Sequence, residues 1–178
     1  MQHATLWPVP VGSAAMMVLV GFGLARFQGA ALAAGDLRPL GRMLAMVLGP
    51  YALVVAGYAL AWGRVPWASV FLVGNLGFAE PERHEMLPYL YWFVEAYAQT
   101  LALVAGAFLL PPVRRLARAA PFRLALTFLA VAVAARFTLP HLWPIGGRQI
   151  FTLPWVLHLA AFGWGAAVAE TPRQRAIL

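Results

Sequence analysis

The sequence predicts an all-α protein, a polytopic transmembrane bundle of about five helical spans with one short re-entrant or interfacial segment. Three observations support this fold class. Of the 178 residues, 62% are hydrophobic. Only 11% are charged, against about 25% in a typical soluble domain. The apolar residues also fall into runs about as long as a bilayer-crossing helix, separated by short segments that carry arginine. The lipid bilayer is therefore the first partner that the sequence implies.

The composition excludes several classes of chemistry. All 13 basic residues are arginine, which excludes a lysine-dependent phosphate loop or Schiff base. Cysteine is absent, which excludes thiol nucleophiles and cysteine-bound metals. Ser13 and Ser69, the only serines, lack the context of a nucleophile elbow. His84-Glu85 begins like a zinc-protease motif, but Pro88 stands where its second histidine belongs. No metal site and no bound cofactor are predicted.

Five apolar runs are predicted to cross the membrane. They cover residues 11–25, 43–62, 87–110, 122–139 and 150–169. The first is short for a span, and we expect Gly21 and Gly23 to let a neighbouring helix approach it closely. Residues 26–42 are predicted to form a polar turn. A sixth apolar run, 65–79, is short and bounded by prolines, which favours a re-entrant or surface-lying segment over a span.

The distribution of arginine predicts the orientation. Segments 26–42, 111–123 and 171–178 together hold nine of the 13 arginines, so the positive-inside rule makes them cytoplasmic. The other loops then lie outside, provided that the short sixth run does not cross. This scheme places the N-terminus outside and the C-terminus inside a cytoplasmic (inner) membrane. No internal repeat or long linker is visible, so residues 1–178 are predicted to form a single domain.

The span at residues 87–110 carries one charge, Glu95. A carboxylate at that depth is costly, so we expect it to face other helices or a wet cavity and to have a partner. Tyr91 and Gln99 lie one helical turn to either side, and Trp92 lies three residues before it, so all three can share its face. Two interpretations remain open: this face is part of a site, or it makes a helix–helix hydrogen bond that fixes packing.

The second predicted span contains Gly49-Pro50-Tyr51. Proline inside a helix removes a backbone hydrogen bond, so Pro50 is expected to kink or break the span. The freed carbonyl groups and Tyr51 would then line a cavity. The alternative is a kink that serves packing alone.

Several stretches, taken in order, resemble the acyltransferase type three superfamily, bacterial multi-span membrane proteins that O-acylate sugars, antibiotics and surface polymers. The matching features are Gly21-Phe22-Gly23-Leu24-Ala25-Arg26-Phe27, then Arg38, Arg42 and Pro50-Tyr51, then Trp92 followed three residues later by Glu95. The closest resemblance is to the membrane modules found fused to, or beside, AMP-forming ligases and peptide synthetases. The resemblance covers most of the chain.

The resemblance implies transfer of an acyl group from a cytoplasmic thioester, of the acyl-CoA type, to a hydroxyl of a sugar or other small acceptor. His3 would take the hydroxyl proton, and Glu95 would orient its ring and stabilise its cation. Arg26, Arg38 and Arg42 would hold the donor phosphates, although the positive-inside signal alone also explains them. Tyr51, Trp92 and Gln99 would complete the substrate-binding set.

The chain also departs from the family pattern. The family has more spans, and it has a helix with an arginine ahead of the position that His3 occupies here. We therefore expect the chain to lack an N-terminal helix. Two other functions stay open: a non-catalytic membrane anchor or scaffold for a neighbouring ligase or synthetase, and a transporter-like module. Later in the chain, Arg136 is expected to snorkel to the outer interface and His158 to hydrogen-bond a neighbouring helix.

Overall fold

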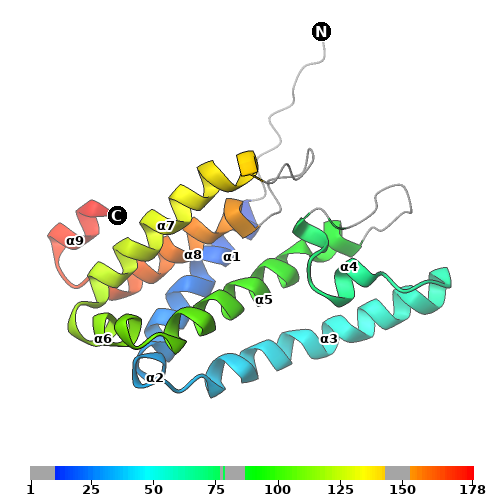
Figure 1. Cartoon of the computed structure of the whole chain (residues 1–178), viewed down its shortest axis with the longest axis horizontal. Helices are drawn as coiled ribbons and strands as arrows, with labels where there is room; N and C mark the ends of the chain where they lie inside the picture. The colour runs from blue at the N-terminus through cyan, green and yellow to red at the C-terminus, as the bar shows by residue number, and fades with distance from the viewer. Residues whose placement is uncertain (1–10, 77, 79–86, 143–152) are drawn as a thin grey trace, which may run out of the picture.

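The structure is a computed structural model that describes residues 11–76, 78, 87–142 and 153–178. These residues form helices and connecting turns, with no strand among them, which confirms the predicted all-α bundle (Figure 1). The helices are α1 (Val11–Gly23), a π-helical turn (Leu24–Gln28), α2 (Gly29–Ala34), α3 (Arg38–Trp62), α4 (Trp67–Val70), the 3-10 turn η2 (Gly74–Leu76), α5 (Leu87–Leu109), α6 (Pro111–Ala119), α7 (Pro121–Leu142), α8 (Leu153–Val168) and α9 (Pro172–Ile177).

The chain is a membrane protein. Four helical stretches in the described ranges are long and apolar enough to cross a bilayer: Ala15–Ala34, Arg38–Trp62, Tyr91–Leu109 and Pro121–Leu139. The fifth predicted span corresponds to α8, an apolar helix of 16 residues. The predicted re-entrant run contains α4 and η2, both far too short to span, and these lie beside α5 and the end of α3 (Figure 1).

The first span extends further than predicted. Helical structure continues past residue 25 through the π-helical turn and α2, so Arg26 lies in a helix and the expected polar turn shrinks to residues 35–37. Two features explain the extension. Gly29–Ala34 is rich in alanine and leucine, which are strong helix formers. Gly35 then ends the helix with a φ of 87°, a left-handed conformation that glycine adopts without steric cost.

Two further segments differ from expectation. The arginine-rich loop 111–123 is largely helical, because α6 starts with proline in its first turn and continues with residues that favour helix. The second span, α3, continues through Pro50 without the predicted break. Pro50 is exposed, whereas Tyr51, the next residue, is buried.

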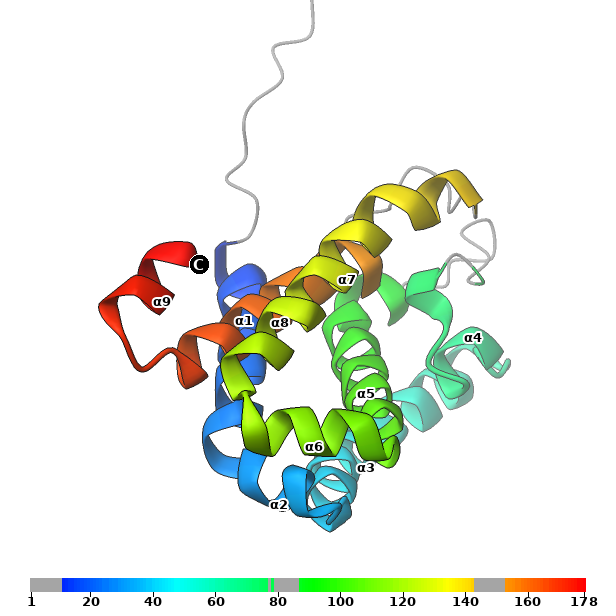
Figure 2. The same ribbon diagram turned by 60° about the vertical axis from the view of Figure 1, so that its left-hand side comes forward.

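Helices α1 and α8 pack closely, with α7 on the other side of α8 (Figure 2). Glycine makes this approach possible. A Cβ atom at Gly21 would overlap the backbone of Ala160, and one at Gly163 would overlap the backbone of Val18. Gly23, in contrast, would meet only the Phe27 side chain, at 3.9 Å. The predicted role in close packing therefore belongs to Gly21.

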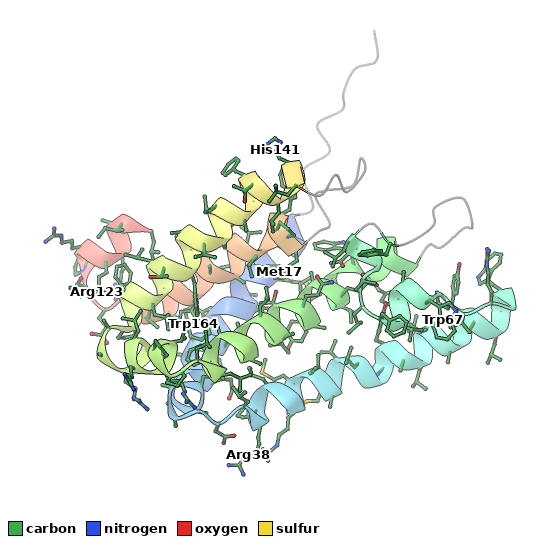
Figure 3. All side chains as sticks on the ribbon, viewed as in Figure 1. Met17, Arg38, Trp67, Arg123, His141 and Trp164 are labelled. Carbon is green, nitrogen blue, oxygen red and sulfur yellow. The ribbon has the colours of Figure 1, made fainter. Side chains whose placement is uncertain are left out.

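An aromatic group joins three helices at one end of the bundle. Phe108 of α5 stacks on Trp164 of α8 with a centroid distance of 5.7 Å, and Phe128 of α7 meets both rings edge-on. Trp164 and Met17 both lie in the interior in Figure 3, at different levels of the bundle. The end of the bundle near Trp164 contains the segments 26–42, 111–123 and 169–178 (Figure 1). We call it the arginine-rich end.

Candidate functional site

Glu95 lies at the centre of a polar cluster buried in an otherwise apolar bundle. Its side chain has no solvent exposure, which places it away from lipid as the sequence predicted. The cluster contains Tyr51 from α3, Asn75 from η2, and Glu95 and Gln99 from α5; we call these four residues the Glu95 cluster. Three separate elements of the fold therefore meet at one carboxylate.

Both oxygens of Glu95 accept hydrogen bonds. The Tyr51 hydroxyl donates to Oε1 at 3.1 Å, and the Asn75 backbone N–H donates to Oε2 at 2.6 Å. Burying a carboxylate without such donors would cost several kcal/mol. The partners that the sequence required are thus a phenol and a backbone amide. Among the described residues no cation forms an ion pair with Glu95.

Gln99 binds the run that was predicted to be re-entrant, one helical turn further along α5. We call its residues 65–76 the re-entrant segment. The Gln99 amide and the Asn75 side-chain amide form a reciprocal pair, with N–H···O distances of 2.7 and 3.1 Å. The Gln99 amide nitrogen also donates to the backbone oxygen of Leu72 at 2.6 Å. Leu72 has a φ of 57°, a left-handed conformation that is unusual for a residue other than glycine. Gln99 therefore stabilises a tight turn that the backbone alone disfavours.

Tyr51 connects this cluster to the far side of the re-entrant segment. Its hydroxyl lies 3.4 Å from the Ser69 backbone oxygen, and its ring meets Tyr91 edge-on at 6.0 Å between centroids. The Ser69 hydroxyl is fully buried and has no hydrogen-bond partner among the described residues. Tyr91 itself departs from helical geometry, with φ −115° and ψ 15°, so α5 is kinked one turn before Glu95.

The remaining predicted site residues lie elsewhere. Trp92 packs in an apolar group with Met17, Ala96 and Val156, on the side of α5 that faces α1 and α8. It does not share the polar face of Glu95 as the helical spacing had suggested. His3 falls outside the described residues, so the pairing of His3 with Glu95 stays a prediction.

The three arginines expected to hold donor phosphates lie at the arginine-rich end and are exposed. Arg38 forms a two-pronged ion pair with Asp36, with Nε to Oδ1 at 2.9 Å and Nη2 to Oδ2 at 3.1 Å. These hydrogen bonds hold the pKa of the Asp36 carboxyl below its usual value. Part of the charge of Arg38 is therefore already balanced within the chain, whereas Arg26 and Arg42 have no acidic partner among the described residues.

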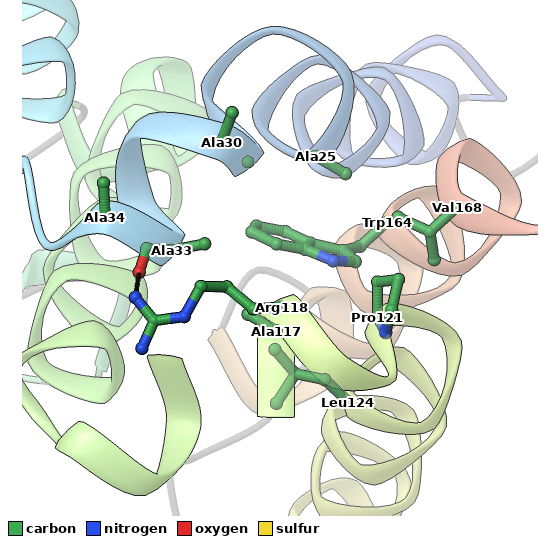
Figure 4. A pocket seen from close by; sticks show the side chains of 11 residues that line it. Ala25, Ala30, Ala33, Ala34, Ala117, Arg118, Pro121, Leu124, Trp164 and Val168 are labelled. Atoms are coloured by element: carbon green, nitrogen blue, oxygen red, sulfur yellow. Dashed lines mark hydrogen bonds between the residues drawn. The ribbon is translucent and has the colours of Figure 1, made fainter. Parts of the chain in front are cut away.

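A cavity of about 450 Å³ opens at the same end (Figure 4). Small residues of α2, including Ala30, Ala33 and Ala34, form one wall, and Trp164 extends into it from α8. The cation in its wall is Arg118 of α6, whose Nη1 donates to the Ala33 backbone oxygen at 2.9 Å. Arg26, Arg38 and Arg42 do not line it.

Glu95 could accept a hydrogen bond from a further donor, such as the N–H of a histidine ring. A carboxylate has about four acceptor positions, and two of them are used here. Within the described residues no group of three histidine, aspartate or glutamate side chains comes together. Comparison of the chain with protein-family models, with curated proteins and with solved structures finds no match.

Sequence reasoning missed Asn75, which provides three of the hydrogen-bonding groups in the Glu95 cluster. A signal was present. Asn75 is the single amide in the apolar run 65–79, and a polar side chain in a segment at membrane depth requires a partner. Its backbone N–H, by contrast, could not have been assigned to Glu95 without the path of the turn.

Proposed function

We propose that this chain is a membrane acyltransferase-like protein, which moves an acyl group from a thioester of the acyl-CoA type to a hydroxyl of a sugar or other small acceptor. The acceptor oxygen would attack the thioester carbonyl. The bond from carbon to sulfur would then break, and coenzyme A would leave as the thiol. The resemblance implies His3 as the base that takes the hydroxyl proton and returns it to the sulfur.

The observation that carries this proposal is the fully buried Glu95, oriented by Tyr51 and Asn75. A carboxylate fixed in this way can stabilise a histidine cation during proton transfer, because its acceptor positions are only half used. A contact that serves packing alone would not need an acidic residue. A glutamine could accept from the Asn75 N–H through its oxygen and donate to the Tyr51 hydroxyl through its nitrogen, at lower cost in a membrane.

The donor would arrive from the arginine-rich end. Under the positive-inside rule this end faces the cytoplasm, which gives an inner-membrane protein with its N-terminus outside and C-terminus inside. Acyl-CoA is a cytoplasmic compound with several phosphates, and exposed guanidinium groups bind phosphate well. Arg26 and Arg42 are exposed there, and the cavity beside Arg118 offers an apolar wall to the pantetheine arm.

A second function is favoured by a different observation. Glu95 accepts hydrogen bonds from Asn75 of the re-entrant segment and from Tyr51 of α3, and its side chain is closed to solvent. That arrangement suits a non-catalytic anchor or scaffold for a neighbouring AMP-forming ligase or peptide synthetase. In this role the Glu95 cluster would shape the outer end of the bundle, and no acyl group would be transferred. A transporter-like module has no specific observation in its favour.

Release of coenzyme A thiol distinguishes the two functions. The full chain, embedded in nanodiscs, would be mixed with acetyl-CoA and a panel of sugars and amino alcohols, and free thiol would be followed with a colorimetric reagent. The chain has no cysteine, so the protein contributes no background. We expect acceptor-dependent release that Glu95→Gln abolishes and that Glu170→Gln, the same change at an exposed position, leaves intact. Absence of release by the unmodified chain would contradict acyl transfer and favour the scaffold, whereas full release by Glu95→Gln would contradict the role assigned to Glu95 in the transfer.

A further inference from the structure

A second polar cluster lies away from Glu95, between α7 and α8. It consists of Arg136 from α7 and Trp155 and His158 from α8, and we call it the Arg136 cluster. Arg136 Nη1 lies 2.8 Å from His158 Nε2, and the guanidinium carbon lies 4.3 Å from the centroid of the Trp155 ring. This confirms that His158 hydrogen-bonds a neighbouring helix, and it identifies the partner.

The geometry sets the roles of these groups. A guanidinium can only donate, so His158 Nε2 must accept, and the ring proton must then be on Nδ1. His158 Nδ1 and Trp155 Nε1 are both buried and have no hydrogen-bond partner among the residues that the structure describes. Buried ring N–H groups of this kind normally have an acceptor. The Arg136 cluster therefore offers donors only.

The charge of Arg136 is also unbalanced. No acidic side chain in the described part of the chain lies within ion-pair distance of it. The described acidic residues are Asp36, Glu95 and Glu170, and Asp36 is paired with Arg38 while Glu95 binds Tyr51 and Asn75. An arginine within a span is costly unless an anion or water accompanies it. His158 accepts one of its N–H groups, and the stack on Trp155 fixes the plane of the guanidinium without neutralising it.

We propose that the Arg136 cluster binds a phosphate oxyanion. Arg136 is only half-buried, and it lies six residues before the end of α7, which is about 9 Å along the helix. This level is close enough to the bilayer surface for a long side chain to reach headgroup phosphates. A planar guanidinium held by a ring on one face and by a histidine at one edge presents its remaining N–H groups to phosphate in a fixed orientation. The phosphate can belong to a phospholipid headgroup or to a soluble phosphate compound. This inference does not depend on acyl transfer.

The two sources can be separated in a bilayer that contains no phosphate. The full chain would be placed in nanodiscs of galactolipid, and its thermal unfolding would be followed while either phosphatidylglycerol is included in the disc or inorganic phosphate is added. Ligand that binds only the folded protein raises the unfolding temperature, and the rise grows with the ratio of ligand concentration to Kd. A response to either arm supports the oxyanion site, and the arm that responds identifies the source.

Two variants localise the response. Arg136→Gln removes the charge while its amide can still donate to His158, and Arg123→Gln makes the same change at an exposed position near the other end of α7. Loss of one charge-assisted hydrogen-bonding group corresponds to roughly tenfold weaker binding. We expect Arg136→Gln to need about tenfold more phosphate for the same rise in unfolding temperature, with Arg123→Gln close to the unmodified chain. Equal responses from all three proteins, or no response in either arm, would overturn the proposal.

A second measurement needs no folded variant at Arg136. With ¹⁵N-labelled histidine, the ring signals of His158 report its hydrogen bond to Arg136 directly. Binding of a phosphate to the guanidinium should shift the His158 Nε2 signal, and the signals of His141 at the end of α7 serve as an internal control (Figure 3). An Nε2 signal that does not move while phosphatidylglycerol or phosphate is titrated would show that the oxyanion binds elsewhere.

Discussion

The backbone N–H of Asn75 donates to Glu95 Oε2 at 2.6 Å, which ties a single helical turn of the re-entrant segment to the buried carboxylate of α5. Asn75 also reaches Gln99 through its side chain, so one residue makes contacts with two successive turns of that helix. The re-entrant segment is therefore held by α5 through hydrogen bonds to a carboxylate and an amide.

We first expect Glu95→Ala to destabilise the fold far more than Glu95→Gln. Alanine leaves the Tyr51 hydroxyl and the Asn75 N–H buried without acceptors, at about 1–3 kcal/mol each. Glutamine fills the same volume and can still accept from Asn75, so its cost should stay near 1 kcal/mol. Unfolding in mixed micelles, followed by tryptophan fluorescence, measures the difference. Equal destabilisation by both changes would show that the carboxylate charge, and not hydrogen bonding, is what the fold requires.

Tyr51→Phe tests one bond of the cluster separately. The ring keeps its contact with Tyr91, and only the hydroxyl is lost. Single side-chain hydrogen bonds inside membranes are worth about 0.6 kcal/mol on average and up to about 1.7. We expect a loss in this range by the same unfolding assay. A loss well above it would indicate that the hydroxyl also satisfies the Ser69 backbone oxygen, which lies within reach at 3.4 Å.

The contact between α1 and α8 makes a prediction about glycine. Gly21→Ala places a methyl group into the backbone of Ala160 on the facing helix, which neither helix can accommodate without moving apart. Overpacking of this kind costs about 1–3 kcal/mol. Gly23→Ala is the matched control, two residues along the same helix with only a flexible side chain nearby, and it should be neutral or slightly stabilising. If both variants lose the same stability, helix α1 does not approach α8 as closely as described.

The orientation can be tested with reporters at two turns. A fusion after Ala120, between α6 and α7, should be cytoplasmic, and a fusion after Gly63, at the end of α3, should be outside. The arginine content of the flanking segments is the reason for both expectations. The reverse pair of results would invert the whole scheme. If both reporters lie on the same side, the chain between Gly63 and Ala120 must cross the membrane twice or not at all, instead of once.

Much of this fold was predictable from sequence. The predicted spans reappear as helices, and the described part of the run 65–79 holds only the short helices α4 and η2, because bilayer thickness sets a minimum length for a span that hydropathy reveals directly. Helix ends were less predictable. Two examples are the π-helical turn, which extends the first span past Arg26, and helix α6. Both depend on local backbone preferences that a run of apolar residues does not reveal.

The candidate site was predictable in part. Burial of Glu95 and its contact with α3 at Tyr51 followed from the cost of a carboxylate in lipid. The partners from the re-entrant segment did not follow, because the turn at Leu72 and the backbone N–H of Asn75 depend on how that segment folds back. Trp92 was assigned to the wrong face for a related reason. Its neighbours Met17 and Val156 come from α1 and α8, and spacing along α5 does not indicate how those helices pack against it.

The most direct test of the role assigned to Glu95 is the accessibility of residue 69. Ser69 lies within the re-entrant segment and is fully buried, and the chain has no cysteine, so Ser69→Cys introduces a single reactive thiol. If Glu95 holds this segment, a membrane-impermeant maleimide should label the thiol slowly in the Ser69→Cys protein. It should label it at least tenfold faster when Glu95→Ala is added, because the lost hydrogen bonds correspond to more than 1.4 kcal/mol of local stability. Labelling at the same rate with and without Glu95 would contradict the account.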